Sequence, residues 1–266
     1  MKRSLKFLSL LLMVMLVLTG CKKEDPKKQL ENALEKLEKA ESVSLKLDAD
    51  LSVSAEGTTM AIGLGLNGDY SLKTKAGHFK ANVSMFGMNE ESEMYMEEKD
   101  GYTYSYEKDD EGWTYTKTAV TEDEKEETKA ADVLKEFKSV KEVKSDKKGY
   151  TKLEVVISKD KLNDTMKENE EMVSGLVDGE MAINKDVTLN VYLKDGEIRF
   201  ITLDLADLLK DAMGEEAASA DMKAVITVEL SNYNKNNDLK VPEEVTKNAK
   251  EEVEMDFEDS ELDFEM

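Results

Sequence analysis

Residues 43–55, VSLKLDADLSVSA, place an apolar side chain at every second position along the whole stretch. Successive side chains of a β-strand point to opposite faces, so this alternation predicts a strand with one buried and one solvated face. Thirteen residues would extend roughly 43 Å, against a usual strand length of about 5–6 residues. A strand this long must twist and curl, so the stretch predicts a curved antiparallel sheet.

The same alternation returns in further segments, and several of these are separated by turn signals. Lys99-Asp100-Gly101 and Lys194-Asp195-Gly196 are typical of tight hairpin turns. The alternating segments are 60–72, 79–85, 94–106, 113–115, 153–157, 187–193, 198–205 and 224–230. The first of them predict five or six antiparallel strands in meander order.

Apolar residues at helical spacing predict amphipathic helices over 29–41, 121–140 and 161–177, and a short helix over 206–213. Each such helix needs an apolar surface to cover, and the concave face of one curved sheet supplies it. The predicted fold class is therefore α+β: a long, strongly curved antiparallel sheet, or half-barrel, with amphipathic helices on its concave face.

Composition excludes several functional classes. The 266 residues include 37 Lys and Arg against 59 Asp and Glu, which gives a formal charge of −22. Nucleic acid is excluded as a partner, because phosphate binding needs a basic surface. One cysteine excludes a disulfide scaffold, and one histidine provides no paired ligands for zinc. We therefore expect no metal, no cofactor and no enzymatic activity.

Residues 63–68 match the pattern GxGxxG, but their context argues against a dinucleotide site. That site needs a helix immediately afterwards, whereas the residues that follow continue a strand pattern. Gly63 and Gly65 fall on the face opposite Leu64 and Leu66, where they would ease bending of the sheet. His78 lies beside Gly77 and is expected in an exposed turn.

The N-terminus predicts export and lipid attachment. Three basic residues precede an apolar run of about 12 residues at 7–18, too short to span a bilayer. The run ends at Leu18-Thr19-Gly20-Cys21, which matches a bacterial lipobox. We expect cleavage after Gly20 and a diacylglycerol thioether on Cys21, with acyl chains such as palmitate. The alternative is an ordinary secretory signal with an incidental cysteine.

These features divide the chain into a signal peptide (1–20), a lipidated tether (21–28), a folded domain (29–250) and an acidic tail (251–266). Loss of Lys2, Arg3 and Lys6 changes the charge to −22 − 3 = −25. Two acyl chains would hold this acidic protein on the extracytoplasmic face of the cell membrane. The tail is expected to be mobile, or alternatively to be a docking segment.

The order of these elements resembles a known group of proteins. The resemblance rests on the lipobox at Cys21, the hairpins at Gly101-Tyr102 and Gly112-Trp113, and the strand end at Asn232-Tyr233-Asn234 before Val241-Pro242-Glu243. Over roughly 29–250, the chain resembles the secreted lipoproteins of Gram-positive bacteria with a LolA-like fold, related to the LppX and LprG lipid carriers. The resemblance implies a half-barrel and a hydrophobic ligand, such as a lipid or an acyl chain.

Apolar and aromatic side chains are the candidate ligand contacts, in an apolar void expected between sheet and helices. They are Leu64, Leu66, Met85, Met94, Met96, Tyr102, Tyr104, Trp113, Met166 and Met172. The aromatic residues could equally form an ordinary packed strand face. We therefore expect a membrane-anchored protein that binds or carries a hydrophobic ligand non-covalently. The alternative is a ligand-free interaction module that acts on a protein partner.

Overall fold

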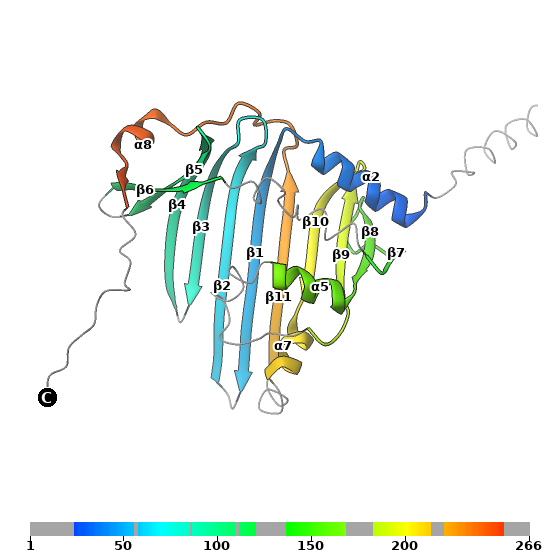
Figure 1. The fold of residues 1–266 in the computed structure, drawn as a ribbon. Helices are drawn as coiled ribbons and strands as arrows, with labels where there is room; N and C mark the ends of the chain where they lie inside the picture. Colours follow the sequence, from blue (N-terminus) through cyan, green and yellow to red (C-terminus); the bar gives the residue numbers. More distant parts are fainter. Residues whose placement is uncertain are drawn as a thin grey trace, which may run out of the picture.

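The computed structural model describes residues 24–55, 58–85, 87–109, 112–120, 137–168, 183–213 and 221–252. Twelve strands form one sheet in the order β12-β6-β5-β4-β3-β2-β1-β11-β10-β9-β8-β7 (Figure 1). The strands are β1 Ser42–Ala55, β2 Thr58–Ser71, β3 Ala76–Met85, β4 Met88–Lys99, β5 Tyr102–Asp109, β6 Gly112–Ala119, β7 Ser139–Val143, β8 Thr151–Ile157, β9 Val187–Lys194, β10 Glu197–Asp204, β11 Asp221–Ser231 and β12 Lys250–Glu251. The helices are α2 Pro26–Glu38, α5 Lys159–Glu168, α7 Ala206–Met213 and α8 Glu243–Asn248.

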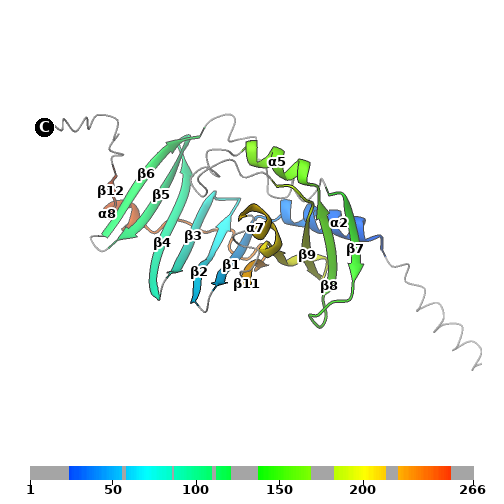
Figure 2. The same ribbon diagram turned by 90° about the horizontal axis from the view of Figure 1, so that it is seen from below.

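The predicted meander is confirmed, because β1 to β6 are neighbours in chain order. On its other side β1 pairs with β11, and the sheet then runs back through β10, β9 and β8 to β7. All these pairs are antiparallel, whereas β12 pairs with β6 in parallel. Seen along its strands, the sheet is an open curve with edges at β12 and β7 (Figure 2). The predicted half-barrel is therefore confirmed.

Strand register places the apolar rows on one face. Leu47 of β1 pairs with Leu66 of β2, which pairs with Ala81 of β3. Helices α2, α5 and α7 lie on this concave side, and α8 lies against β6 on the outer side (Figure 2). The concave face is thus the one that the alternation predicted to be apolar.

Helix α2 closes one half of the concave face. Asp25 caps it by accepting a hydrogen bond from the Lys27 N–H at 2.9 Å, and Pro26 occupies the first turn, where its missing N–H is not needed. Leu30, Ala33 and Leu34 fall on one stripe and are buried. Their neighbours in the core include buried residues of β8, β9, β10 and β11.

Three predicted boundaries need correction. Helix α2 begins at Pro26, so residues 26–28 of the predicted tether 21–28 are helical. Part of the predicted helix 121–140 is strand β7, because Val140 pairs with Val155 of β8; residues 121–136 lie outside the described part. Glu251 belongs to β12, not to a tail, and residues 253–266 also lie outside the described part.

The remaining elements agree with prediction more closely. Helix α5 begins two residues before the predicted 161–177, whose last nine residues lie outside the described part, and α7 matches 206–213. Both predicted hairpin turns have left-handed central residues: φ is 54° and 80° at Asp100 and Gly101, and 56° and 70° at Asp195 and Gly196. These values fit the two-residue turns that match strand twist.

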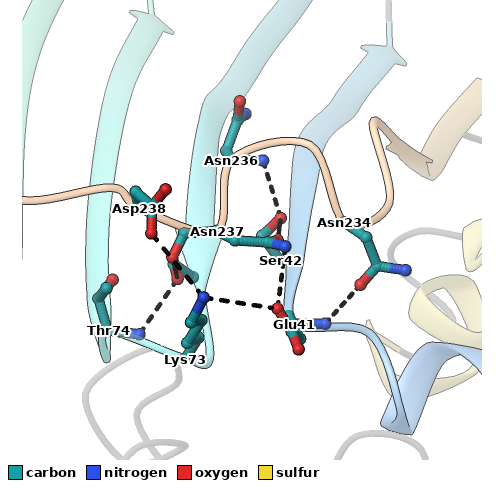
Figure 3. Close-up of polar contacts among 9 residues, drawn as sticks. Glu41, Ser42, Lys73, Thr74, Asn234, Asn236, Asn237 and Asp238 are labelled. Carbon is teal, nitrogen blue, oxygen red and sulfur yellow. Dashed lines mark hydrogen bonds and ion pairs between the residues drawn. The ribbon is translucent and has the colours of Figure 1, made fainter.

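After β11 the chain crosses the ends of β1 and β2 on its way to α8 (Figure 3). Ser42, which is fully buried, accepts from the Asn236 N–H at 2.9 Å and donates to Asn237 Oδ1 at 2.7 Å. Ser71, also fully buried, donates to the Asn237 carbonyl at 3.1 Å. Lys73 forms ion pairs with Glu41 and Asp238 at 4.0 and 3.9 Å. We call these contacts the polar clasp; they fix the path that brings α8 to β6.

Candidate ligand-binding face

The predicted ligand contacts lie on two different faces of the sheet. Five of them, namely Leu64, Leu66, Met85, Met94 and Met96, lie on the concave face. Tyr102, Tyr104 and Trp113 lie on the outer face, because they pair with Lys99, Glu97 and Lys108. The Met166 side chain and the whole of Met172 lie outside the described residues. The structure therefore brings half of the predicted set to one face.

The hairpin turn between β4 and β5 determines which of these residues lie on the same face of the sheet. A two-residue turn at Asp100-Gly101 pairs Lys99 with Tyr102. Tyr102 and Tyr104 must then share a face with the odd-numbered residues of β4, whereas Met94 and Met96 point the other way. Counting residues from the predicted turn would therefore have shown that the tyrosines of β5 and the methionines of β4 cannot line one site.

The aromatic residues of β4, β5 and β6 form a small core under α8. Tyr106 is 5% exposed and packs with Val241 and Val245, which are also buried. The Tyr106 and Tyr115 rings have centroids 5.9 Å apart. Burial raises the pKa of Tyr106, and its hydroxyl donates to Glu97 Oε1 at 3.1 Å. Tyr104, Trp113 and Tyr115 are partly buried against this core, as expected for a packed strand face, whereas Tyr102 is 38% exposed.

His78 lies within β3, which corrects the expected exposed turn. Its ring stacks on Tyr95 with a centroid distance of 4.2 Å and an interplanar angle of 8°. Its Nε2 is 2.7 Å from Glu93 Oε1, and this hydrogen bond lowers the pKa of the Glu93 carboxyl. His78 therefore belongs to the polar packing of the outer face.

Apolar side chains are exposed together at the far end of β2, β3 and β4 on the concave face. We define the open apolar patch by Met60, Ile62, Leu64, Val83, Met85 and Met88. Register joins these residues directly, since Leu64 pairs with Val83, Ile62 with Met85, and Met85 with Met88. Five of the six are between 37% and 66% exposed. Scattered exposed apolar residues are ordinary, but a contiguous set marks a binding surface.

Glycines of β2 show how the outer side of this region is built. A Cβ at Gly65 would lie 1.9 Å from Asn82 Oδ1, and one at Gly63 would lie 2.7 Å from Ser84 Oγ. Polar side chains of β3 therefore occupy the space above these glycines. The GxGxxG segment lies wholly in strand β2, as expected, so the dinucleotide interpretation fails.

Toward the start of β1 the same concave face is filled. The Phe79 ring lies where a Cβ on Gly68 or Gly77 would stand, at 2.5 and 2.4 Å. Met94 and Met96 are half-buried beside it. The open apolar patch is thus bounded by Phe79 and Met94 at one end and reaches the strand tips at the other.

Two open hollows in the molecule are polar. One, of about 870 Å³, lies beside β4 and β5 and is lined mainly by charged and amide side chains such as Lys80, Glu91 and Lys108. The other, of about 570 Å³, lies between α2 and the hairpins of β7–β10, with Glu24 and Asp195 in its wall. Neither is the apolar void expected between sheet and helices. Among the described residues, five of the seven large apolar side chains that are exposed belong instead to the open patch.

Within the described ranges, no group of three or more His, Cys, Asp or Glu side chains is arranged to hold a metal ion. Nor does any helix within these ranges have the length and hydropathy required to cross a membrane.

Comparisons with known proteins place the chain in a family. No curated protein matches it. The structure of Mycobacterium tuberculosis lipoprotein LppX matches with a TM-score of 0.43 and 11% identity, over 81% of this chain and 97% of that one. A DUF1329 family protein from Desulfovibrio piger (TM-score 0.26, 8% identity) and a domain from Vibrio parahaemolyticus ascribed to outer membrane lipoprotein sorting (TM-score 0.23, 9% identity) each match over 81% of this chain and 95% of theirs.

LppX is one of the proteins that the sequence resemblance named. A family model matches residues 26–250, which is most of the chain. The chain is therefore a member of DUF6612, a family of unknown function.

Proposed function

We propose that this chain is a lipid-anchored protein on the extracytoplasmic face of a Gram-positive cell membrane, and that it binds a lipid or an acyl chain non-covalently. The open apolar patch carries the proposal. In a chain with 36% charged residues, its exposed members lie together on one face of one sheet. No covalent step is involved, so the protein acts as a carrier and not as an enzyme.

The patch has the chemistry needed for a flexible alkyl chain. Covering about 250 Å² of apolar surface would contribute about 6 kcal/mol before the costs of association. Met60, Met85 and Met88 provide unbranched thioether side chains that adapt to different shapes. We therefore expect weak selectivity among acyl chains.

The position of the anchor supports exchange away from the bilayer. With α2 starting at Pro26, residues 22–25 remain as the tether, and they reach about 14 Å at most. Glu24 shares a hollow with Asp195 at the β9–β10 turn, which lies at the end of the sheet where β1 starts. The patch lies toward the opposite end, because Leu64 and Met60 pair with Ala49 and Val53. These residues are about 23–36 Å along β1 from its start at Ser42. The ligand would therefore be held far from the anchoring membrane.

An interaction module remains the second candidate, and the openness of the patch favours it. An enclosed cavity would isolate an acyl chain, whereas a flat exposed surface also suits an apolar segment of a partner protein.

Ligand binding can be tested with charge substitutions on the two faces of the same strands. Leu64→Asp and Val83→Asp place a carboxylate in the patch. Ala61→Asp and Asn82→Asp place the same charge at exposed positions on the outer face. We expect protein purified without detergent to bind a fluorescent fatty acid, with at least tenfold weaker affinity in the first pair and less than twofold change in the second.

Equal losses of fatty-acid affinity in both pairs of variants would argue against the patch as the binding site. Absence of both extractable lipid and fatty-acid binding in the wild-type chain would overturn the carrier proposal and leave the interaction module. Anchoring is tested separately: Cys21→Ser should release the protein into the medium, and full membrane retention would contradict a lipid on Cys21.

A further inference from the structure

A basic segment stands out in this acidic chain. Residues 138–152 contain six lysines against Glu142 and Asp146, a local charge of +6 − 2 = +4 where the whole chain has −22. The lysines are Lys138, Lys141, Lys144, Lys147, Lys148 and Lys152. They lie on β7, on the β7–β8 hairpin and at the start of β8, the outermost strands at one edge of the sheet.

Acidic partners neutralise only some of these lysines. Lys138 pairs with Asp186 at 2.7 Å, and Lys152 with Asp146 at 3.5 Å. Among the described residues, no ion pair includes Lys141, Lys144 or Lys148, and all three are exposed. Their charge is therefore available to an external partner.

Aromatic rings lie beside the lysines on the outer face. Lys152 pairs across the sheet with Tyr192, which pairs with Phe200. The Lys147 Nζ lies 4.6 Å from the Phe200 ring centroid, and the Lys194 Nζ lies 5.5 Å from that of Tyr150. Lysines combined with amphipathic aromatic rings are typical of surfaces at a bilayer interface.

The same end of the molecule holds the start of α2. The Lys27 Nζ lies 5.4 Å from the ring centroid of Phe137, just before β7. Glu24, just before α2, and Gly149, on the β7–β8 hairpin, line the same hollow. Figure 1 shows the start of α2 and strands β7 and β8 together at one side of the sheet. A lipid on Cys21 would therefore bring this end to the bilayer first.

We propose that this region, which we call the basic end, docks on anionic phospholipid headgroups and fixes the orientation of the anchored protein. The basic end comprises Lys141, Lys144, Lys147, Lys148 and Lys194 with Tyr150 and Phe200, while the buried Tyr192 supports these rings from below. The inference rests on the proposed anchored location but not on the proposed ligand. The docked orientation points the open apolar patch away from the bilayer.

The overall negative charge does not prevent this docking. The Debye length is about 10 Å at 0.1 M salt, so headgroups interact with the nearest lysines while distant carboxylates are screened. Each lysine close to an anionic surface increases partitioning about fivefold. Removal of three such charges should therefore lower partitioning about a hundredfold.

A vesicle-binding experiment tests the surface without the anchor. The mature chain with Cys21→Ser is mixed with vesicles of one part phosphatidylglycerol to two parts phosphatidylcholine, and bound protein is measured by co-sedimentation. The test variant is Lys141→Gln/Lys144→Gln/Lys148→Gln. The control is Lys99→Gln/Lys240→Gln/Lys250→Gln, which removes three exposed lysines at the other end of the sheet.

We expect the wild-type chain and the control to bind the anionic vesicles within twofold of each other, and the test variant to bind about a hundredfold more weakly. Binding should fall as NaCl rises from about 0.05 M to about 0.3 M. Equal loss in both variants, equal binding to pure phosphatidylcholine, or no binding by the wild-type chain would overturn the proposal. No ligand is added, so this outcome is independent of the fatty-acid assay.

Orientation is measured on the lipidated protein. Cys21 is the only cysteine of the chain, so Lys148→Cys and Lys99→Cys each provide a unique thiol for a fluorophore once the lipid occupies Cys21. Energy transfer to an acceptor in the bilayer surface should be strong from position 148 and weak from position 99. Equal transfer from both positions would exclude the docked orientation.

Discussion

Strands β7–β11 and strands β2–β6 carry the same alternation of apolar and polar side chains, but they are covered from opposite faces. In the first group, α2 packs on the concave face, where Leu30 and Leu34 are at most 1% exposed. In the second group, α8 packs on the outer face over Tyr106 and Trp113, while part of the concave face remains exposed. The alternation of apolar and polar residues shows which side chains share a face of the sheet. The helix that packs on the sheet decides which of the two faces becomes core.

The length of α2 explains why it covers only part of the concave face. The 13 residues of α2 extend about 20 Å, which corresponds to about four strands at 4.8 Å spacing. The helix accordingly contacts β7 and β10. A sheet of twelve strands is much wider, so one such helix leaves most of the concave face to other segments or to ligands.

The largest expected effect compares one leucine from each region. Leu34→Ala should lower the free energy of unfolding by about 3 kcal/mol, because a fully buried side chain leaves a cavity. Leu64→Ala should cost less than about 1 kcal/mol, because this side chain is 46% exposed. Urea denaturation followed by circular dichroism measures both. Equal losses would mean that the patch is structural core, which would break the comparison.

A smaller effect tests how α8 is held against the outer face of the sheet. Ser42→Ala removes the acceptor of the Asn236 N–H and the donor to Asn237, leaving partly buried polar groups without these partners. We expect a loss of about 1–2 kcal/mol and faster hydrogen exchange in α8 and β6. Ser52→Ala, on the same face of β1 but less buried, is the matched control and should change neither. Unchanged exchange in α8 would show that the polar clasp does not position it.

The smallest effect concerns Glu93 on the outer face, whose pKa is lowered by its hydrogen bond to His78. A carboxyl with a lowered folded-state pKa stabilises the fold fully above its ordinary pKa of about 4.3. That contribution is lost as the pH falls through the lowered value. The Tm difference between wild type and Glu93→Gln should therefore be present at pH 7 and shrink below about pH 4. A difference that grows with acidity would contradict this assignment.

Several features of the fold were predictable because their causes are local. The alternation around Leu47 and Ala49 predicted β1, and Asp100-Gly101 predicted a two-residue turn that in turn fixes register. Strand β7 was not predicted, because Val140 also fits a helical stripe and only its pairing with Val155 makes it strand. Helix α8 had a weak signal, a proline before two glutamates at 242–244, which is typical of a helix start.

The candidate site was half predictable for the same reason. Leu64 and Met85 are apolar residues of adjacent strands, and register brings them to one face. Tyr104 and Trp113 have side chains suited to a ligand contact, but the turn at Asp100 places them on the other face. No local pattern in the sequence predicts a surface at the lysines of the β7–β8 hairpin, because their proximity to the start of α2 arises only from packing.

By itself the sequence determined the strands, their turns and the side chains that share a face, because backbone geometry ties each of these to neighbouring residues. Only the tertiary structure decided which surfaces are covered. That choice depends on where α2 and α8 reach across the sheet, and their contacts join residues far apart in the chain. The exposed patch and the basic end are both consequences of this long-range packing.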